Sequence, residues 1–279
     1  MNDVNSRVVT VSLANGRRVA FEVDQSATGP ACFVLGVHKC GSTMLNIICQ
    51  RLAVRNSRHC VLVGSVFFFE NVREDVWSHD PAICDMLRPG NVYTGFRMMP
   101  TVFASNPVFL EGRKILMVRD PRDALVSEFF SVAYSHPVPA RTGSDSPVTD
   151  MMEQARQLAL NTGIDEFVTK HAGGMRDAFL GYTDDLRSTG TVVVKYEDSI
   201  FRKRPLIATI AQHFGWAVTA SEVDLIMAEV DQWPATENPS AVIRQVRPGD
   251  HRNKLSAKTI AKLNDKLRPA IEAFGYPAE

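Results

Sequence analysis

The chain has 279 residues, which is enough for one large α/β domain or two smaller ones. Its 45% hydrophobic and 22% charged residues are those of a soluble globular protein. The 31 basic and 31 acidic residues cancel, so no overall charge attracts the protein to nucleic acid or to an anionic membrane, and local basic clusters must carry any anion binding.

The first predicted element is an N-terminal β-hairpin. Two β-rich runs, 8–13 and 18–23, flank a turn with an Asn-Gly pair, which is typical of a tight hairpin. We expect residues 1–30 to form a hairpin extension that covers a sheet edge or a dimer contact. A single domain over residues 31–279 is expected to follow.

A strand, a lysine-bearing loop and a helix come next. The apolar run 31–35 predicts a buried parallel strand, and the apolar residues of 44–52 share one face of a helix. Lys39, Ser42 and Thr43 lie between them. The free amides and the dipole at the start of a helix favour an anion, so the segment indicates a phosphate cradle. The alternative is an ordinary strand–turn–helix with an exposed lysine.

This loop differs from the nucleoside-triphosphate loop G-x-x-x-x-G-K-[ST]. There the lysine follows the second glycine, whereas here Lys39 precedes Gly41. The apolar strand predicted at 113–118 ends in a mixed basic and acidic run and not in an aspartate suited to hold magnesium. We therefore expect the anion site to work without a divalent metal.

The later segments alternate between strand and helix patterns. Such alternation predicts a three-layer α/β fold, in which helices cover both faces of a central parallel sheet. The Pro-, Ser- and Gly-rich stretch 135–150 is expected to be a lid or a disordered loop. The further predicted strands are 59–63, 91–97, 113–118 and 191–196, and the further predicted helices are 121–134, 151–171, 174–187, 202–214, 219–231 and 256–273.

Four separated segments together resemble one family. They are 36–45, 119–127, 194–198 and 243–253, and they resemble, in the family's order, the sulfotransferases that use 3′-phosphoadenosine-5′-phosphosulfate (PAPS). The resemblance covers roughly residues 31–270. It implies the P-loop NTPase-like sulfotransferase fold for the domain at 31–279.

The resemblance assigns the donor site residue by residue. The family's 5′-phosphosulfate loop, K-[SA]-G-[TS]-T, matches Lys39, Cys40, Gly41, Ser42 and Thr43. The family often has a tryptophan next, near the adenine, and this chain has a methionine, which can also pack on a ring. The implied donor-binding residues of this loop therefore extend from Lys39 to Met44.

The other three segments imply contacts to the far end of the donor. Arg119 and Ser127 match the arginine and serine that bind the 3′-phosphate, and Tyr196 matches a tyrosine near the adenine. Arg244 matches the arginine of the late R-K-G-x-x-G-D-W motif, again at the 3′-phosphate. Gln and Val replace the next two residues of that motif, so Arg247 is expected to supply the missing charge. The alternatives to these donor contacts are that the arginines form surface ion pairs and that Tyr196 is a half-buried core residue.

The general base is the point at which the sequence departs from the family. Many members carry a histidine in a K-T-H-L-P segment, and the matching region 94–100 has none. Branches that act on sugar chains use an acidic residue next to H-F-F-D, which Phe67-Phe68-Phe69-Glu70 resembles. Glu70 is therefore the expected base, if its carboxylate is partly desolvated and not a solvated loop acid. His136, His79 and His59 are the alternatives, and Arg97 would hold an anionic group.

The resemblance implies in-line transfer of a sulfuryl group from PAPS to an acceptor hydroxyl, with an amine as the second choice of acceptor. Lys39 would act as a catalytic residue, because it stabilises the charge that builds up on the leaving oxygen. The product would be 3′-phosphoadenosine-5′-phosphate (PAP), and no metal is expected. The alternatives are a metal-dependent P-loop kinase of a small metabolite and a non-catalytic protein that binds PAPS or PAP.

The acceptor is expected to be a small molecule, a lipid or a carbohydrate. Phe67–Phe69, Phe96, Met98, Met99 and the 135–150 loop would line a hydrophobic acceptor pocket or belong to the core. No nucleic-acid partner, signal peptide or transmembrane segment is expected, and a homodimer is possible. The five cysteines show no pairing pattern, which indicates reduced thiols and a cytoplasmic protein.

Overall fold

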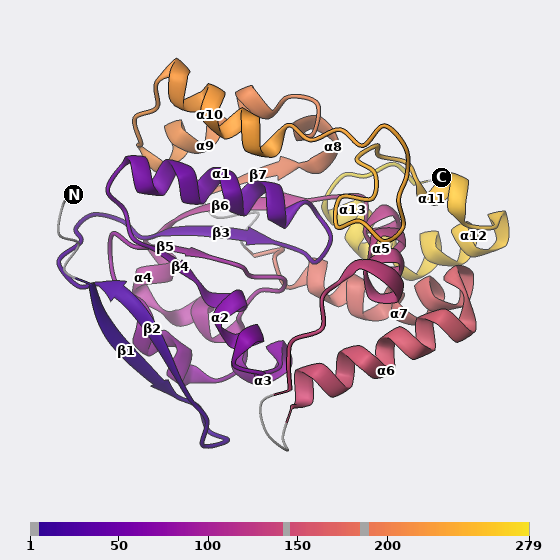
Figure 1. Cartoon of the computed structure of the whole chain (residues 1–279), viewed down its shortest axis with the longest axis horizontal. Coiled ribbons are helices and arrows are strands. Elements are labelled where there is room, and N and C mark those ends of the chain that lie inside the picture. Colours follow the sequence, from indigo (N-terminus) through magenta and orange to yellow (C-terminus); the bar gives the residue numbers. More distant parts are fainter. Residues whose placement is uncertain (1–5, 142–145, 185–189, 279) are drawn as a thin grey trace.

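The structure is a computed structural model that describes residues 6–141, 146–184 and 190–278. Figure 1 shows a central sheet with helices on both sides and a separate two-stranded ribbon near the N-terminus. None of the helices in these ranges is both long and apolar enough to cross a lipid bilayer.

The central sheet has five parallel strands in the order β4-β5-β3-β6-β7. β3 is the middle strand, and all five of its residues are buried, as expected for a strand covered on both faces. The predicted parallel sheet is therefore confirmed. The strands are β3 (Cys32–Gly36), β4 (Cys60–Leu62), β5 (Val92–Thr94), β6 (Arg113–Val118) and β7 (Thr191–Lys195).

Helices cover the two faces of this sheet and give it three layers, as predicted. On one face α1 packs on β3 and against α9 and α10, above the sheet in Figure 1. On the other side α7 packs against α5, α12 and α13 (Arg268–Ala273). The long helices are α1 (Ser42–Arg55), α5 (Pro121–Phe130), α6 (Pro147–Thr162), α7 (Ile164–Leu180), α9 (Lys203–Phe214), α10 (Ala220–Val230) and α12 (Ala257–Lys266).

Short helices connect these elements. They include a π-helical turn that extends α5 at its C-terminal end. The short helices are α2 (Val63–Phe69), α3 (Glu74–Trp77), η1 (Pro81–Met86), η2 (Thr101–Ser105), α4 (Pro107–Leu110), η3 (Ser131–Ser135), α8 (Tyr196–Ser199), α11 (His251–Lys254) and α13 (Arg268–Ala273).

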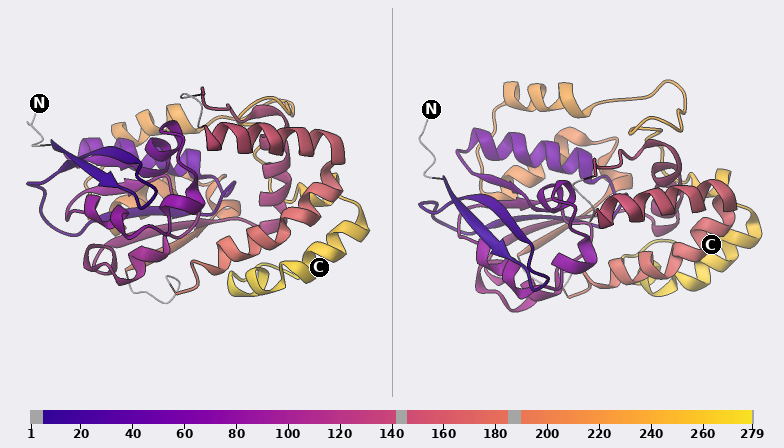
Figure 2. Two further views of the ribbon diagram at one scale, coloured as in Figure 1. Left: turned by 90° about the horizontal axis from the view of Figure 1, so that it is seen from below. Right: turned by 60° about the horizontal axis from the view of Figure 1, so that its bottom comes forward.

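The predicted N-terminal hairpin is present. β1 (Ser6–Ser12) and β2 (Arg18–Asp24) pair in antiparallel register, with Gly16 at φ 82° in the turn. The hairpin contributes Val11 and Phe21 to the main core, where the Phe21 ring lies 5.1 Å from that of Phe67. Figure 2 shows the hairpin and the helices α12 and α13 at opposite ends of the molecule.

Three predicted helices have different boundaries in the structure. Gly163, at φ 77°, separates α6 from α7, whereas the prediction placed this break near Gly173. α7 ends at Leu180, and residues 185–187 of the predicted helix lie outside the described part of the chain. The predicted helix 256–273 is divided at Leu267 into α12 and α13.

The predicted loop at 135–150 is shorter than expected. α6 begins at Pro147, which suits the first position of a helix because proline lacks an amide hydrogen. Residues 142–145 of the predicted loop fall outside the described ranges. The prediction that this stretch is a lid stays a prediction.

Candidate active site

The loop between β3 and α1 has a backbone that favours an anion. Lys39 and Gly41 both have positive φ, 65° and 95°, and turn the chain so that α1 begins at Ser42. A Cβ on Gly41 would lie 2.7 Å from Cδ2 of Tyr196, so glycine is needed here for both its conformation and its size. Neither a side-chain cap nor an acidic residue occupies the first turn of α1, which leaves its amides free for a ligand.

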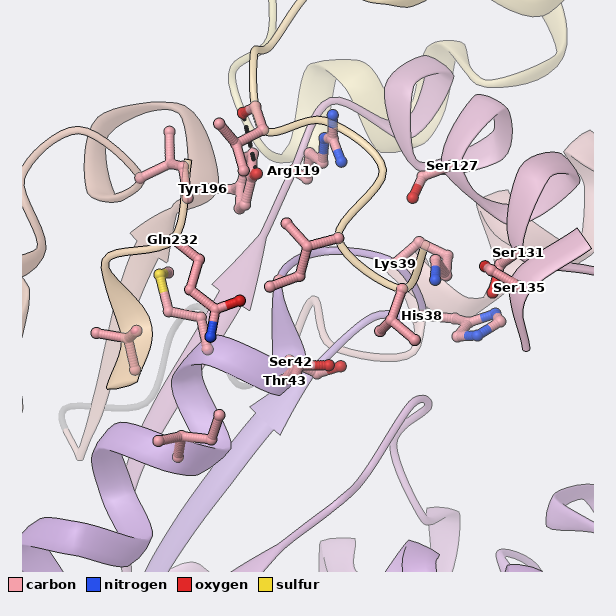
Figure 3. A pocket seen from close by; sticks show the side chains of 18 of the residues that line it. His38, Lys39, Ser42, Thr43, Arg119, Ser127, Ser131, Ser135, Tyr196 and Gln232 are labelled. Carbon is pink, nitrogen blue, oxygen red and sulfur yellow. Dashed lines mark hydrogen bonds between the residues drawn. The ribbon is translucent and has the colours of Figure 1, made fainter. Parts of the chain in front are cut away.

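A cavity of about 380 Å³ opens in front of this loop, and we call it the donor cavity. Figure 3 shows Lys39, Arg119 and Ser127 around it, with Ser42 and Thr43 at the start of α1. The structure thus brings together side chains from the loop, from the end of β6 and from α5. Its lining includes His38, Lys39, Gly41, Ser42, Thr43, Met44, Arg97, Arg119, Ser127, His136, Tyr196, Gln245 and Val246.

The guanidinium of Arg119 is buried and only partly paired. It lies 4.5 Å from the ring centroid of Tyr196, whose hydroxyl donates to the carbonyl oxygen of Val246 at 3.0 Å. An Arg119 Nη2–Asp123 Oδ2 distance of 3.6 Å marks a loose ion pair, and Nε of Arg119 has no hydrogen-bond partner among the described residues. A buried N–H without a partner is costly, so an anionic ligand here would satisfy it.

Positive charge is concentrated in the donor cavity. Burial, followed by the nearby charge of Arg97, lowers the pKa of Lys39 to about 8, and Arg119 and Arg244 act in the same direction. An anion in the cavity would offset this repulsion and raise the pKa of Lys39 again. The site therefore has the electrostatics of a binding site for a multiply charged anion.

Three of the predicted donor-binding residues do not line this cavity. Arg244 pairs with Glu237 and Asp250 and lies 4.0 Å from the ring centroid of Phe130. Arg247 is exposed. Cys40 is buried, which raises the pKa of its thiol, and its Sγ lies 3.8 Å from the carbonyl oxygen of His38.

The segment that carries Arg244 still reaches the donor cavity through its neighbours Gln245 and Val246. Asp123 holds its far end: its carboxylate accepts hydrogen bonds from the amides of Gly249 and His251. Because Asp123 also faces Arg119, one buried carboxylate links the late segment to the predicted 3′-phosphate arginine. In the structure, Arg244 is a partner of acidic groups and not a wall of the cavity.

A second cavity, of about 670 Å³, adjoins the first, and we call it the acceptor cavity. His38, Arg97 and His136 line both cavities, so these three residues mark their junction. The walls of the acceptor cavity are mostly apolar. They include Phe68, Val72, Trp77, Met98, Val132, Val148, Met151, Met152 and Met175.

The three phenylalanines of α2 have separate roles. Phe67 is fully buried in the core, Phe68 lines the acceptor cavity, and Phe69 is 69% exposed. A helix explains this division, because consecutive residues point about 100° apart. The sequence did not decide whether these phenylalanines belong to the core or line a pocket, and the structure shows both.

Glu70 lacks the partly desolvated carboxylate that the prediction required of a general base. The residue is exposed at the C-terminal end of α2, and it is not among the described residues that line either cavity. The predicted desolvated carboxylate is therefore wrong for Glu70. The chain bends after α2, and another acid, Glu74, lines the acceptor cavity, where burial raises its pKa.

Of the alternative bases, only His136 is at the junction of the cavities. Its Nε2 is buried and has no hydrogen-bond partner within the described ranges. Burial and the nearby charge of Arg97 lower its pKa to about 4. His79 contacts Thr101, His59 contacts the carbonyl oxygen of Glu22, and neither lines the two cavities described here.

Sequence reasoning missed an ionisable cluster at the same junction. Oε1 of Glu128 lies 3.6 Å from Nδ1 of His38 and 3.9 Å from Nδ1 of His171. Burial raises the pKa of Glu128, but the two histidines outweigh it and bring the pKa to about 2. The signal was present in the sequence, since His38 directly precedes Lys39 and Glu128 directly follows Ser127.

No group of three or more His, Cys, Asp or Glu side chains suited to a metal ion occurs in the part of the chain that the structure describes. The polar groups of the donor cavity beside the loop are instead the cations Lys39 and Arg119, the hydroxyls of Ser42, Thr43 and Ser127, and the first amides of α1. They are donors to an anion and not ligands of a cation.

Comparisons with known proteins bear on the fold. No protein-family model matches the chain, and no curated protein matches its sequence. A solved mouse sulfotransferase complexed with PAP is similar with a TM-score of 0.57 and 14% identity, over 88% of this chain and 86% of that one.

Two structures of retinol dehydratase are also similar. One, in complex with androsterone and the inactive cofactor PAP, has a TM-score of 0.53 and 11% identity over 96% of this chain and 90% of that one. The other, in complex with retinol and PAP, has a TM-score of 0.51 and 13% identity over 96% of this chain and 91% of that one. The central parallel sheet, its flanking helices and these likenesses show that the chain contains a sulfotransferase-fold domain.

Proposed function

We propose that this protein is a sulfotransferase that moves a sulfuryl group from PAPS to the hydroxyl of an apolar acceptor. The observation that carries the proposal is the shared cavity of Lys39 and Arg119, which come from different strand ends and face one space. A nucleotide with phosphates at its 5′ and 3′ positions has charges that match such a separated pair. The PAP-bound structures that share the fold support this choice.

In the proposed complex the α1 end of the cavity holds the 5′-phosphosulfate. Lys39, Ser42 and Thr43 and the first amides of α1 donate to its oxygens, while Arg119 and Ser127 hold the 3′-phosphate. Tyr196 and Met44, which packs against the same small apolar cluster as Tyr196, contact the adenosine. This proposal gives the guanidiniums of Arg244 and Arg247 no direct contact with the nucleotide, because neither residue is among the described residues that line the donor cavity.

Lys39 has the catalytic role in the transfer. The acceptor oxygen attacks sulfur in line, and the bond from sulfur to the bridging oxygen of the 5′-phosphate breaks. Negative charge develops on that bridging oxygen, so a lysine and helix amides beside it stabilise the transition state more than the ground state. The partly buried position of Lys39 strengthens this effect, since water screens the charge less there.

The acceptor enters through the second cavity. A space of about 670 Å³ with mostly aromatic, aliphatic and thioether walls fits a lipophilic molecule better than a carbohydrate, which needs many polar partners. Its hydroxyl would lie at the junction marked by His38, Arg97 and His136. All five cysteines are free thiols, which supports the cytoplasmic location proposed here.

Two measurements test the proposal. Calorimetric titration should show that PAP binds without metal and that ATP with magnesium binds far more weakly. Incubation with PAPS and a panel of lipophilic alcohols, phenols, amines and sugars should then give sulfated alcohols or phenols, detected by mass spectrometry. Preference for ATP with magnesium would instead favour a kinase, and PAP binding without any turnover would favour a non-catalytic nucleotide-binding protein.

A further inference from the structure

Glu128 and two histidines form a cluster that the donor site does not use. The three residues come from separate elements: His38 from the loop before α1, Glu128 from α5 and His171 from α7. One carboxylate oxygen, Oε1, faces Nδ1 of both imidazoles, at 3.6 Å and 3.9 Å. All three side chains line the acceptor cavity, and His38 also lines the donor cavity.

The position of His38 suits a group that receives a proton from the acceptor. It is adjacent in sequence to Lys39, and its amide donates to the carbonyl oxygen of Arg97 at 3.2 Å, which fixes the backbone at the junction. Because Nδ1 faces Glu128, Nε2 is the nitrogen left for a hydroxyl in the acceptor cavity. A carboxylate behind a histidine holds the ring in one orientation and stabilises its protonated form.

His136 shares the junction but lacks this support. The charged groups that depress its pKa include Arg97, Lys39 and Arg156, and its Nε2 has no partner in the described part of the structure. A proton on His136 would therefore add charge to a cationic environment. Burial lowers the pKa of His38 as well, but a proton on His38 would face the Glu128 carboxylate, which offsets the repulsion from Arg97 and Lys39.

We infer that His38 is the catalytic residue that accepts the acceptor's proton, and that Glu128 is a positioning residue whose Oε1 faces both His38 and His171. The inference rests on the proposed sulfuryl transfer. As the acceptor oxygen bonds to sulfur, its O–H proton moves to Nε2 of His38. The electron pair of the breaking sulfur–oxygen bond stays on the 5′-phosphate of PAP, and the proton later passes to solvent.

The test compares two acceptors with different acidity. A lipophilic alcohol needs a base at neutral pH, whereas a nitrophenol is already largely ionised and does not. His38→Asn should lower kcat for the alcohol by about 10²- to 10⁴-fold, but by less than about tenfold for the nitrophenol. The matched control is His79→Asn, because His79 is exposed and contacts Thr101 away from both cavities. Its kcat for the two acceptors should equal that of the wild type.

The positioning role of Glu128 predicts a change in pH dependence. Without the carboxylate, protonated His38 is less stable, so Glu128→Gln should shift the acidic limb of the kcat profile for the alcohol to lower pH. The other groups that face His38 are Arg97, Lys39 and His136. They are unchanged in this variant and serve as a constant background.

The outcomes separate the inference from the proposed function. Each variant is first titrated with PAP, whose Kd should stay within about threefold of the wild type if the fold is intact. Equal loss of kcat for both acceptors in His38→Asn, or a selective loss in His136→Asn instead, would overturn the inference and leave sulfuryl transfer standing. Absence of PAP binding and of turnover in the wild-type protein would overturn the proposed function itself.

Discussion

At the scale of single residues, Lys39 and Arg119 face the same cavity but are expected to act at different stages. Lys39 lies next to the start of α1, where the bridging oxygen of the donor would lie. Arg119 lies at the end of β6 against Tyr196. In the proposed reaction, Lys39 would therefore act in bond breaking, and Arg119 would act in binding alone.

We expect Lys39→Ala to lower kcat by about 10²- to 10³-fold, which is the usual cost of removing one donor to a developing oxyanion. The Kd for PAP should rise much less, because the charge on the bridging oxygen is fully developed only as the bond breaks. Single-turnover assays with saturating PAPS measure the first quantity, and titration with PAP measures the second. Near-normal turnover would contradict the role assigned to the loop.

We expect Arg119→Ala to weaken PAP binding by about 10- to 150-fold, which corresponds to about 1.5–3 kcal/mol for a hydrogen-bonded charge. Binding of adenosine 5′-phosphate, which lacks the 3′-phosphate, should hardly change. Arg247→Ala is the matched control, since Arg247 is exposed and lies outside the lining of the donor cavity in the described residues. If both nucleotides lost affinity equally, Arg119 would not read the 3′-phosphate.

The donor loop could be predicted from sequence because contiguous residues carry it. Lys39, Gly41 and Ser42 need only a strand before them and a helix after them to face one cavity. The residues that line the acceptor cavity could not be predicted in this way, because the bend of the chain after α2 decides which of them are buried. Glu70 follows the phenylalanines of α2 and is exposed, whereas Glu74 lies four residues later and lines the acceptor cavity.

At the scale of secondary-structure elements, α2 lies unusually close to the loop after β5. A Cβ added to Gly64, in the first turn of α2, would lie 2.0 Å from the carbonyl oxygen of Gly95. Such a clash with backbone cannot be relieved by rotating a side chain. Since α2 carries Phe68 to the acceptor cavity, this close contact also sets the position of one cavity wall.

Gly64→Ala is therefore expected to lower the free energy of unfolding by about 1–3 kcal/mol, as overpacking usually does. Gly173→Ala is the control within a helix. Its Cβ would meet nothing within 4 Å, so it should raise the free energy of unfolding by about 0.5–1 kcal/mol. Denaturant titration followed by circular dichroism measures both values. Equal stability of the two variants would contradict the close contact.

The helix boundaries show what sequence patterns leave undetermined. Gly163 ends α6, whereas Gly173 and Gly174 lie inside α7. All three glycines have the same intrinsic preference against helix. Tertiary packing decides between them, because Ala172 and Met175 beside the glycine pair are buried in the core.

At the scale of the whole molecule, the N-terminal hairpin is part of the main core. Val11, Val19, Phe21 and Val23 are all nearly inaccessible and belong to the same cluster as Phe67. The side chain of Asn91, just before β5, bonds to the backbone of Asp24 in both directions. We propose that residues 31–279 form one domain and that the hairpin is an extension on which this domain depends.

Deletion of residues 1–25 is expected to prevent folding. Burial of a large apolar side chain contributes about 1.5–3 kcal/mol, so the loss of four such residues approaches the whole stability of an ordinary domain. Gel filtration and thermal unfolding by circular dichroism measure the result. A truncated chain that melted at the temperature of the full chain would show that the hairpin is dispensable.

The thioethers of the acceptor cavity have a chemical consequence of their own. Met98, Met151, Met152 and Met175 all contribute to its walls. Peroxide converts a thioether to a sulfoxide, which is polar and bulkier, and reductase enzymes reverse the change. Oxidative stress would therefore turn a lipophilic cavity into a hydrophilic one, while the lysine, arginine and hydroxyl groups that line the donor cavity would be left chemically intact.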